Sequence, residues 1–251
     1  MGIRPKTKAE QQAMIEGGKI LGEILKEISQ MVKPGMTAKD IDAFAEKRMK
    51  EFNVIPSFKG YHGFPGVTCV SINEEVVHGI PGDRVIKDGD LVKVDCGVIH
   101  KKLHTDSALP ILVGNVDPKV KHFAETIDKA LHKGIEKARA GNSLYEIASA
   151  IQSTVEGSGY EIVRELTGHG IGYNLHEEPY VLNYREESLK KIILKTGMTI
   201  AIEPIATMGK RNIKTLDDKW TIVTKDASIA TQSEHTVLIT DEECIILTNR
   251  Y

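Results

Sequence analysis

The chain has 251 residues, with 33 lysine and arginine residues, 35 aspartate and glutamate residues and a formal net charge of −2. This length allows one large domain or two small ones, and the near-neutral charge argues against a protein built mainly to bind nucleic acid or an anionic membrane. Three scattered cysteines form no C-x-x-C pair, which indicates a reduced intracellular protein. No apolar run approaches the roughly 20 residues that span a bilayer, and the N-terminus lacks the apolar core of a secretory signal. We therefore expect a soluble cytoplasmic protein.

The first part of the chain is predicted to form two helices followed by short strands. Apolar residues recur at helical spacing from about Lys8 to Met31, and a Lys-Pro-Gly sequence at 33–35 ends this helix. Thr37 is expected to cap a second helix. The strands that follow are separated by proline and glycine. They are expected at Val67 to Ile72, Val76 to Ile80, Asp90 to Val94 and Ala108 to Val113.

The same pattern then restarts. Pro118 to Ala140 is predicted to be a second long helix, and Leu144 to Glu156 a second shorter one. An Ala-Gly-Asn-Ser sequence at 140–143 separates them, as the turn before Thr37 separates the first pair. Further strands are expected at Glu161 to Leu166, Thr199 to Ile205, Thr221 to Val223, Thr236 to Ile239 and Cys244 to Leu247.

The repetition extends to acidic residues. Asp95 and Glu203 each follow a Lys-x-Gly turn and an apolar run of equal length, and each precedes a second acidic residue, Asp106 or Glu234. We interpret this as a diverged internal duplication, in which each half places two carboxylates on strands that meet at the centre. The expected halves are about 1–115 and 116–251, within a single catalytic domain of 1–251.

Charged residues lie in or beside apolar or glycine-rich stretches, where a charge has no ordinary reason to be. Asp95, for example, ends the apolar run 91–94. Acidic residues are rarely buried unless paired, and divalent metal compensates several at once. An oxygen-rich set with one imidazole suits two cations that share carboxylates better than one structural zinc. The predicted metal ligands are Asp95, Asp106, His169, Glu203 and Glu234.

Such a set would support hydrolysis of an amide. Two metals about 3.5–4 Å apart can hold a bridging hydroxide and lower its pKa towards neutrality. A carbonyl polariser and a proton shuttle are then needed. His169, between two glycines, would supply the nitrogen ligand. His78 and His176 are predicted to line the substrate cleft from opposite halves, where either could donate a hydrogen bond to the scissile amide or to the developing oxyanion.

Each residue also has an ordinary interpretation. Asp95 could be a residue at a strand end, Asp106 a loop aspartate and His169 a loop histidine bonded to backbone. The sequence TGHGIG lacks the third glycine of a dinucleotide-binding loop, and HEEPY is not the H-E-x-x-H zinc motif. Cys69 could be a nucleophile, although a small apolar pocket residue is favoured. The joint order of the acidic residues in two halves favours the metal site.

Five segments together resemble a known family. They are CVSINEEVVHGIP, VDCG, TGHGIG with HEEP, AIEP and SEHT. In this order and spacing they resemble the type I methionine aminopeptidase family, in its short bacterial form, over nearly the whole chain. The resemblance implies the α+β creatinase-like "pita-bread" fold. In that fold two pseudo-two-fold-related halves share a central, mostly antiparallel sheet covered by helices.

The resemblance also implies an activity. The family removes the initiator methionine from nascent polypeptides when the next residue is small, and a hydroxide bridging two divalent ions (Co, Mn, Fe or Zn) attacks the scissile carbonyl. It implies the same five ligands, with Asp95 and Glu234 bidentate or bridging. It implies contacts from His78 and His176 to the substrate amide, and a proton-shuttle role for Glu203. The implied partners are nascent chains at the ribosome, and we expect a monomer without membrane or nucleic-acid partners.

Selection of methionine needs a narrow apolar pocket. Residues that resemble the family's pocket are Phe58, Tyr61, Phe64, Cys69 and Trp220. Leu175 stands where many relatives have an aromatic residue, and the HTDSA segment around Asp106 differs from the more usual glycine-aspartate sequence. These departures bear on pocket shape and on the level of activity.

Two alternatives remain at this point. A proline-directed peptidase of the same fold would usually carry a large extra N-terminal domain and would read differently around CVSINEEVVHGIP. A metal-free relative that only binds peptides would be expected to lack some ligands. Cleavage of X-Pro peptides would favour the first alternative, and absence of turnover with any divalent metal would favour the second.

Overall fold

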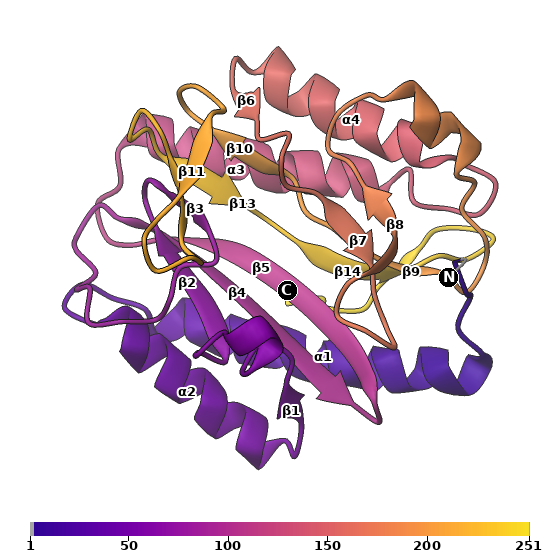
Figure 1. Ribbon diagram of the computed structural model, residues 1–251, viewed down its shortest axis with the longest axis horizontal. Helices are drawn as coiled ribbons and strands as arrows, with labels where there is room; N and C mark the ends of the chain where they lie inside the picture. Colours follow the sequence, from indigo (N-terminus) through magenta and orange to yellow (C-terminus); the bar gives the residue numbers. More distant parts are fainter. Residues whose placement is uncertain (1–2, 251) are drawn as a thin grey trace.

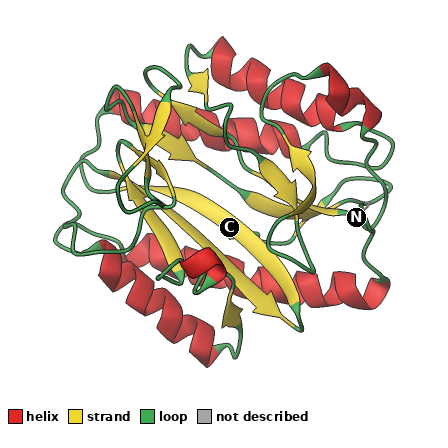
Figure 2. Ribbon diagram, in the orientation of Figure 1, coloured by secondary structure: helices red, strands yellow, loops and turns green. Residues whose placement is uncertain are grey.

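The structure, a computed structural model, describes residues 3–250. Two pairs of helices enclose a set of strands (Figures 1 and 2), with α1 and α2 at the bottom of Figure 1 and α3 and α4 at the top. The predicted α+β class is confirmed. The helices are α1 (Lys8–Met31), α2 (Ala38–Glu51), α3 (Pro118–Ile135) and α4 (Leu144–Gly157), with short 3-10 helices η1 (Tyr61–Gly63) and η2 (Glu187–Lys191).

Capping explains where the shorter helix of each pair begins. The Thr37 hydroxyl accepts from the Asp40 amide at 3.2 Å, and the Asp40 carboxylate accepts from the Thr37 amide at 2.7 Å. Ser143 and Glu146 form the same reciprocal cap at α4. The helix predicted to end at Ala140 ends earlier, at Ile135, because the chain turns there and the Ala140 amide donates to the Thr240 carbonyl.

The strands pair antiparallel, as expected, but they form four separate sheets rather than one central sheet. One sheet contains β1 (Ile55–Pro56), β4 (Leu91–His100), β2 (Thr68–Ile72) and β5 (Leu103–Leu112). A second contains β15 (Ile245–Ile246), β14 (His235–Leu238), β9 (Thr199–Ile202), β7 (Gly168–Gly170) and β8 (Glu177–Val181). The others contain β13 (Ala230–Gln232), β10 (Ile205–Thr207) and β6 (Glu161–Ile162), and β11 (Ile213–Thr215), β12 (Ile222–Thr224) and β3 (Glu75–Val77).

The predicted bounds of the central hairpin were wrong. β4 continues past Val94 to His100, and β5 begins at Leu103 rather than at Ala108. The hairpin turns at Lys101 and Lys102, whose φ angles are +49° and +70°. Neither residue is a typical turn former, so the turn was missed. Asp95 therefore lies within a strand and does not end one.

Three other predicted strands are shorter or divided. The run from Thr199 to Ile205 is two strands of different sheets, interrupted at Glu203 and Pro204. Pro204 has no N–H to donate to a ladder. β3 stops before His78, whose φ of +58° leaves the strand conformation. β6 covers only the beginning of the strand predicted at 161–166. β1, β7, β8, β11 and β13 were not predicted, because they are short and lack an alternating apolar pattern.

Each half has its own apolar core. One cluster joins α1 and α2 to β2, β4 and β5, and another joins α3 and α4 to β9 and β14. Backbone conformations recur between the halves: Gly35 and Gly141 have φ of +93° and +89°, and Gly89 and Gly197 have φ of +91° and +88°. These matches support the proposed duplication. Between residues 3 and 250, no helix has both the length and the apolar content to cross a bilayer.

Candidate metal centre and substrate cavity

The β4–β5 hairpin presents two carboxylates on one face. Asp95 pairs with Ala108 and Asp106 with Gly97, so the two acidic side chains are diagonal neighbours on the same side of the hairpin. A Cβ at Gly97 would lie 2.9 Å from the Cβ of Ser57, so this position has no room for a side chain. The hairpin of the first half therefore directs both carboxylates towards a common cavity.

The second half brings its three residues to the same place. His169 in β7 pairs with Ala201 in β9, and Glu203 directly follows β9. Glu234 directly precedes β14, which pairs antiparallel with β9. The Glu234 amide donates to the Ala108 carbonyl at 2.8 Å, which joins this segment to β5. The two halves thus meet along β5 and the segment before β14.

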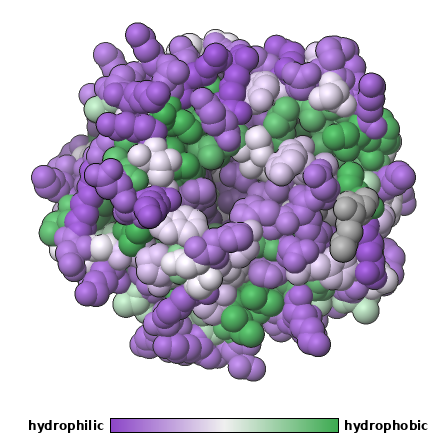
Figure 3. All heavy atoms as spheres, in the orientation of Figure 1, coloured by the Kyte–Doolittle hydropathy of each residue, from purple (hydrophilic) through white to green (hydrophobic). Residues whose placement is uncertain are grey.

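The predicted ligands line one cavity of about 180 Å³. Ligand atoms of Asp106, His169 and Glu234 all lie within 4.8 Å of one another, and Asp95 and Glu203 line the same space. The space-filling view has a recess near the centre of this face, over the region between β5 and β14 in Figure 1 (Figure 3). The structure therefore brings all five predicted residues together, three of them within the spacing of ligands to a single ion.

Two buried carboxylate oxygens test whether the site fits a cation. Asp95 Oδ1 and Glu234 Oε1 are buried, and neither has a hydrogen-bond partner among residues 3–250. A buried charge without a partner costs several kcal/mol in real proteins, of the order of the ion desolvation penalty. Carboxylate oxygens with one imidazole are the donor set that divalent cations accept. The residues present fit a metal site.

The four carboxyl groups repel one another in an environment poor in water. Burial raises the pKa of Asp95 to about 7. Burial, and then the charge of Glu234, raise the pKa of Asp106 well above its usual range. Burial followed by the charges of its neighbours does the same to the pKa values of Glu203 and Glu234. Arg250 acts in the opposite direction on the pKa of Glu234. All four carboxyls therefore need positive charge to be ionised together.

His169 is held as a neutral imidazole. Its Nδ1 donates to the Gly170 carbonyl at 2.9 Å, which leaves the Nε2 lone pair facing the cavity, 3.5 Å from Glu203 Oε1. Burial lowers the pKa of His169 to about 3. A Cβ at Gly168 would lie 2.3 Å from the Ala201 carbonyl oxygen, so only glycine allows β7 to approach β9 this closely. The flanking glycine and the bond to Gly170 fix where the imidazole points.

Two further histidines and a tyrosine lie at the cavity. His78, half-buried, and His176, exposed at the mouth, both line it. The Tyr61 hydroxyl lies 2.9 Å from His176 Nδ1, and the rings of His169 and His176 are 4.3 Å apart. Burial lowers the pKa of His78 to about 4, so this imidazole is neutral at pH 7 and can donate one N–H.

The remaining wall of the cavity is apolar. The Phe64 and Trp220 rings pack edge to face with centroids 5.1 Å apart. A volume of about 180 Å³ is smaller than the roughly 300–1,000 Å³ of pockets that enclose a whole small-molecule ligand. A space of this size suits one side chain rather than a whole ligand. The apolar lining consists of Phe58, Phe64, Cys69, Leu175 and Trp220.

Some neighbours of the site were not predicted. Gln232 donates through Nε2 to Asp95 Oδ2 at 3.3 Å. Thr236 and Arg250 bind the backbone of the ligand segments from behind. Gln232 and Thr236 flank Glu234 in the sequence, so their polarity in a buried strand was a usable signal. Arg250 gave none, because nothing local shows that the chain end returns to the centre.

Comparison with known proteins identifies the family. The model of metallopeptidase family M24 matches residues 12–241. The chain belongs to metallopeptidase family M24. As an M24 peptidase it is a hydrolase of peptide bonds that uses metal. It is 44% identical to methionine aminopeptidase 1 of Bacillus subtilis over 243 residues. The aligned region covers 97% of this chain and 98% of the relative.

Solved structures of M24 peptidases agree with this assignment. The crystal structure of methionine aminopeptidase from Thermotoga maritima has a TM-score of 0.96 and 39% identity, over 99% of this chain and 100% of that one. A prolidase from Pyrococcus horikoshii has a TM-score of 0.78 at 24% identity, and this chain spans 64% of it. The prolidase shares the fold alone. The predicted pita-bread fold is confirmed.

Proposed function

We propose that this M24 peptidase removes the N-terminal methionine from polypeptides whose second residue is small. The observation that carries the proposal is one cavity with two unlike walls. One wall holds four carboxyl groups and a neutral imidazole, and the other is apolar and narrow. A relative 44% identical over 97% of this chain is named a methionine aminopeptidase. The metal-binding wall faces the bond to be cleaved, and the apolar wall holds the methionine side chain.

We propose two divalent cations at this centre, held by Asp95, Asp106, His169, Glu203 and Glu234. Divalent cations in such a site polarise a carbonyl and lower the pKa of water. The formal charge of four carboxylates equals that of two such cations, which supports two ions over one. Mn, Fe, Co and Zn all accept this mixture of oxygen and imidazole ligands.

The chain's own residues position the substrate and move protons. His78 and His176 approach from different halves and donate N–H groups to the scissile amide. If the Tyr61 hydroxyl donates to His176 Nδ1, the remaining proton is on Nε2 and faces the substrate. The Glu203 carboxyl, whose pKa burial raises, accepts a proton and passes it to the leaving amine.

Selection comes from the size of the cavity. Phe58, Phe64 and Trp220 enclose an unbranched apolar side chain and exclude a branched or charged one. His78 and His176 at the mouth restrict the space for the second residue. We propose that the substrates are nascent chains leaving the ribosome in the cytoplasm, and that the enzyme acts as a monomer.

A peptide assay tests the proposed function. Protein loaded with manganese is expected to release methionine from Met-Gly and Met-Ala-Ser peptides and to spare Met-Lys peptides. The control is the same protein treated with a chelator. Cleavage of X-Pro peptides would instead favour a proline-directed peptidase. No turnover with Mn, Fe, Co or Zn would favour a protein that only binds peptides.

A further inference from the structure

Behind the ligand side chains, the two halves are joined through hydrogen bonds to backbone. The Thr236 hydroxyl donates to the Asp106 carbonyl at 2.7 Å and accepts from the Asp106 amide at 3.0 Å. The Ser107 hydroxyl donates to the Glu234 carbonyl at 2.6 Å. Asp106 and Glu234, from different halves, therefore depend on this junction for their relative position.

The side chain of Arg250 lies at the same junction. Its Nη1 donates to the Ser107 hydroxyl at 2.9 Å and to the Glu234 carbonyl at 3.0 Å, and its Nη2 donates to the Ser233 hydroxyl at 3.4 Å. The residue is only 7% exposed. One guanidinium thus contacts Ser107, which follows Asp106, together with the backbone of Glu234 and the preceding residue, Ser233.

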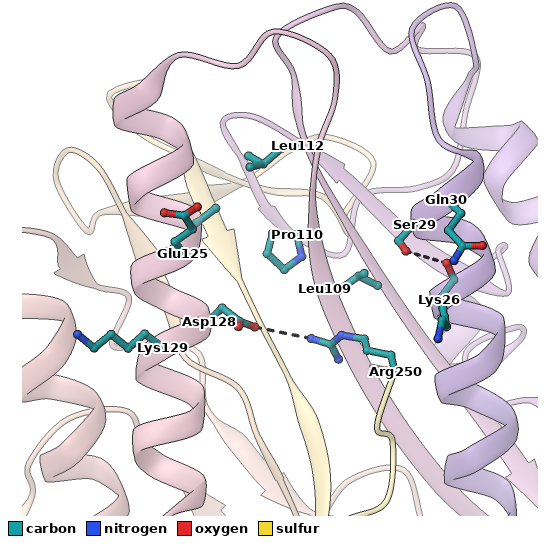
Figure 4. A pocket seen from close by; sticks show the side chains of 11 residues that line it. Lys26, Ser29, Gln30, Leu109, Pro110, Leu112, Glu125, Asp128, Lys129 and Arg250 are labelled. Atoms are coloured by element: carbon teal, nitrogen blue, oxygen red, sulfur yellow. Dashed lines mark hydrogen bonds and ion pairs between the residues drawn. The ribbon is translucent and has the colours of Figure 1, made fainter.

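Arg250 reaches the junction from the side opposite the metal cavity. Successive residues of a strand face opposite sides, so Asp106 faces the cavity and Ser107 faces away from it. On that far side a second cavity of about 600 Å³ lies between α1 and α3 and is lined by Arg250 and Asp128. Figure 4 shows the Arg250 side chain extending towards Asp128 on α3, at an Nη2–Oδ1 distance of 4.0 Å.

The segment before Arg250 is fixed by close packing on α1. A Cβ at Gly18 would lie 2.5 Å from the Leu247 carbonyl oxygen, and one at Gly22 would lie 2.2 Å from the Asn249 carbonyl oxygen. Only glycine allows the helix and this segment to approach so closely. The backbone next to Arg250 is therefore held against α1, which fixes the position from which the Arg250 side chain extends to the junction.

We propose that Arg250 is a positioning residue for the metal centre, which holds Ser107 and the backbone of Glu234 so that the Asp106 and Glu234 carboxylates converge. The inference rests on the proposed metal ligands. A planar guanidinium presents several N–H donors in a rigid fork, and a lysine ammonium cannot reproduce their directions. Arg250, in the second half, thus sets the relative position of Asp106 from the first half and Glu234 from the second.

The test compares metal affinity in variants of the full chain. Manganese titration calorimetry of the metal-free protein is expected to give about 10–100-fold weaker binding for Arg250→Gln, the usual effect of removing a partner that orients a ligand. Arg250→Lys is expected to recover only part of this loss. KM for Met-Ala-Ser at saturating manganese is expected to stay within about twofold of the wild-type value, because Arg250 does not touch the cavity.

Arg48→Gln is the matched control. Arg48 on α2 is half-buried and pairs with Glu27 at 2.6 Å, but it lies outside the cavity. Its substitution is expected to lower the unfolding temperature and to leave manganese affinity unchanged. A folded Arg250→Gln protein with wild-type affinity would overturn the inference. Should Arg250→Gln fail to fold, Ser107→Ala decides, since unchanged affinity there would equally overturn it. A wild-type protein that binds no manganese would refute the metal site itself.

Discussion

The ionised form of the Asp106 carboxyl destabilises this fold unless a positive charge compensates it. It is 4% exposed, and burial and the charge of Glu234 raise its pKa well above the usual range. Without metal, the folded state binds a proton at this residue more tightly than the unfolded state does. The ionised form therefore costs stability, and this cost grows as the pH rises through the folded-state pKa.

Asp106→Asn is therefore expected to raise the unfolding temperature of the metal-free protein, and to do so more at pH 8 than at pH 5. At pH 5 the wild-type carboxyl is protonated in the folded state to a greater extent than at pH 8, so the substitution has less to relieve. The same variant is expected to bind manganese more than about 100-fold more weakly, since it removes a proposed ligand rather than a group behind one. Thermal unfolding by circular dichroism at both pH values, with chelator present, measures the first effect.

The prediction concerns the difference in unfolding temperature between Asp106→Asn and wild type at each pH. The contributions of histidines that titrate in the same pH range are common to both proteins and cancel in this difference. His78 and His169 have lowered pKa values in the folded state, so they contribute stability that is lost as the pH falls below their unfolded values. An equal gain at pH 5 and pH 8 would mean that Asp106 is not held as a buried acid.

Tyr61 offers a second prediction about a single residue. Its hydroxyl lies 2.9 Å from His176 Nδ1, and we propose that this contact sets which nitrogen of that ring carries the proton. Tyr61→Phe is expected to lower kcat about fivefold, the effect of one hydrogen bond worth about 1 kcal/mol at a catalytic group. Manganese affinity should not change. The control is Tyr145→Phe, which removes a hydroxyl outside the cavity. Wild-type kcat in Tyr61→Phe would show that the hydroxyl does not orient His176.

Among the elements, those with strong local signals could be predicted. α1 was predicted with its observed bounds because its apolar face repeats over about four turns, and Thr37 and Ser143 marked the starts of the shorter helices. The short strands β7 and β13 could not be predicted. Three residues carry no periodicity, and their conformation comes from the strands on either side.

In the site too, residues with a local sequence signal could be predicted and residues without one could not. The proposed ligands were predicted because acidic residues beside apolar runs recur in the same order in two halves of the sequence. The hydrogen bond between Arg250 and Ser107 could not be predicted, since 143 residues separate the two and neither has an unusual sequence context. Contacts of that kind depend on how whole elements pack, which a local pattern does not contain.

The β7–β9 pairing is an element whose spacing can be tested. Gly168→Ala places a methyl group 2.3 Å from the Ala201 carbonyl oxygen, which must force β7 away from β9 and displace His169. Such overpacking costs about 1–3 kcal/mol. We expect a lower unfolding temperature in chemical or thermal denaturation, together with weaker manganese binding.

Gly157→Ala is the control for this change, because nothing lies within 4 Å of a Cβ at the end of α4. It is expected to be neutral or slightly stabilising, since alanine loses less conformational entropy than glycine. If Gly168→Ala retains full manganese affinity, the close approach of β7 to β9 is not what places His169.

Across the whole molecule, each half has its own core, and the halves share a third. That cluster takes Met14 and Leu103 from the first half and Ile171 and Leu238 from the second. β3 of the first half also pairs with β12 of the second. These shared contacts support the proposal of a single domain, because neither half can bury its side of the seam alone.

Metal should therefore stabilise both halves at once. The proposed ligands come from β4 and β5 on one side and from the β7, β9 and β14 segments on the other, so no half can bind the ions alone. With manganese at 100 times its dissociation constant, the free energy of unfolding is expected to rise by about 2.7 kcal/mol for each ion bound. Trp220 fluorescence reports on the cavity and far-UV circular dichroism on all four helices. Both signals are expected to change in one coincident transition that shifts together with manganese concentration. Two separate transitions, of which manganese moves only one, would contradict both the single domain and the shared metal centre.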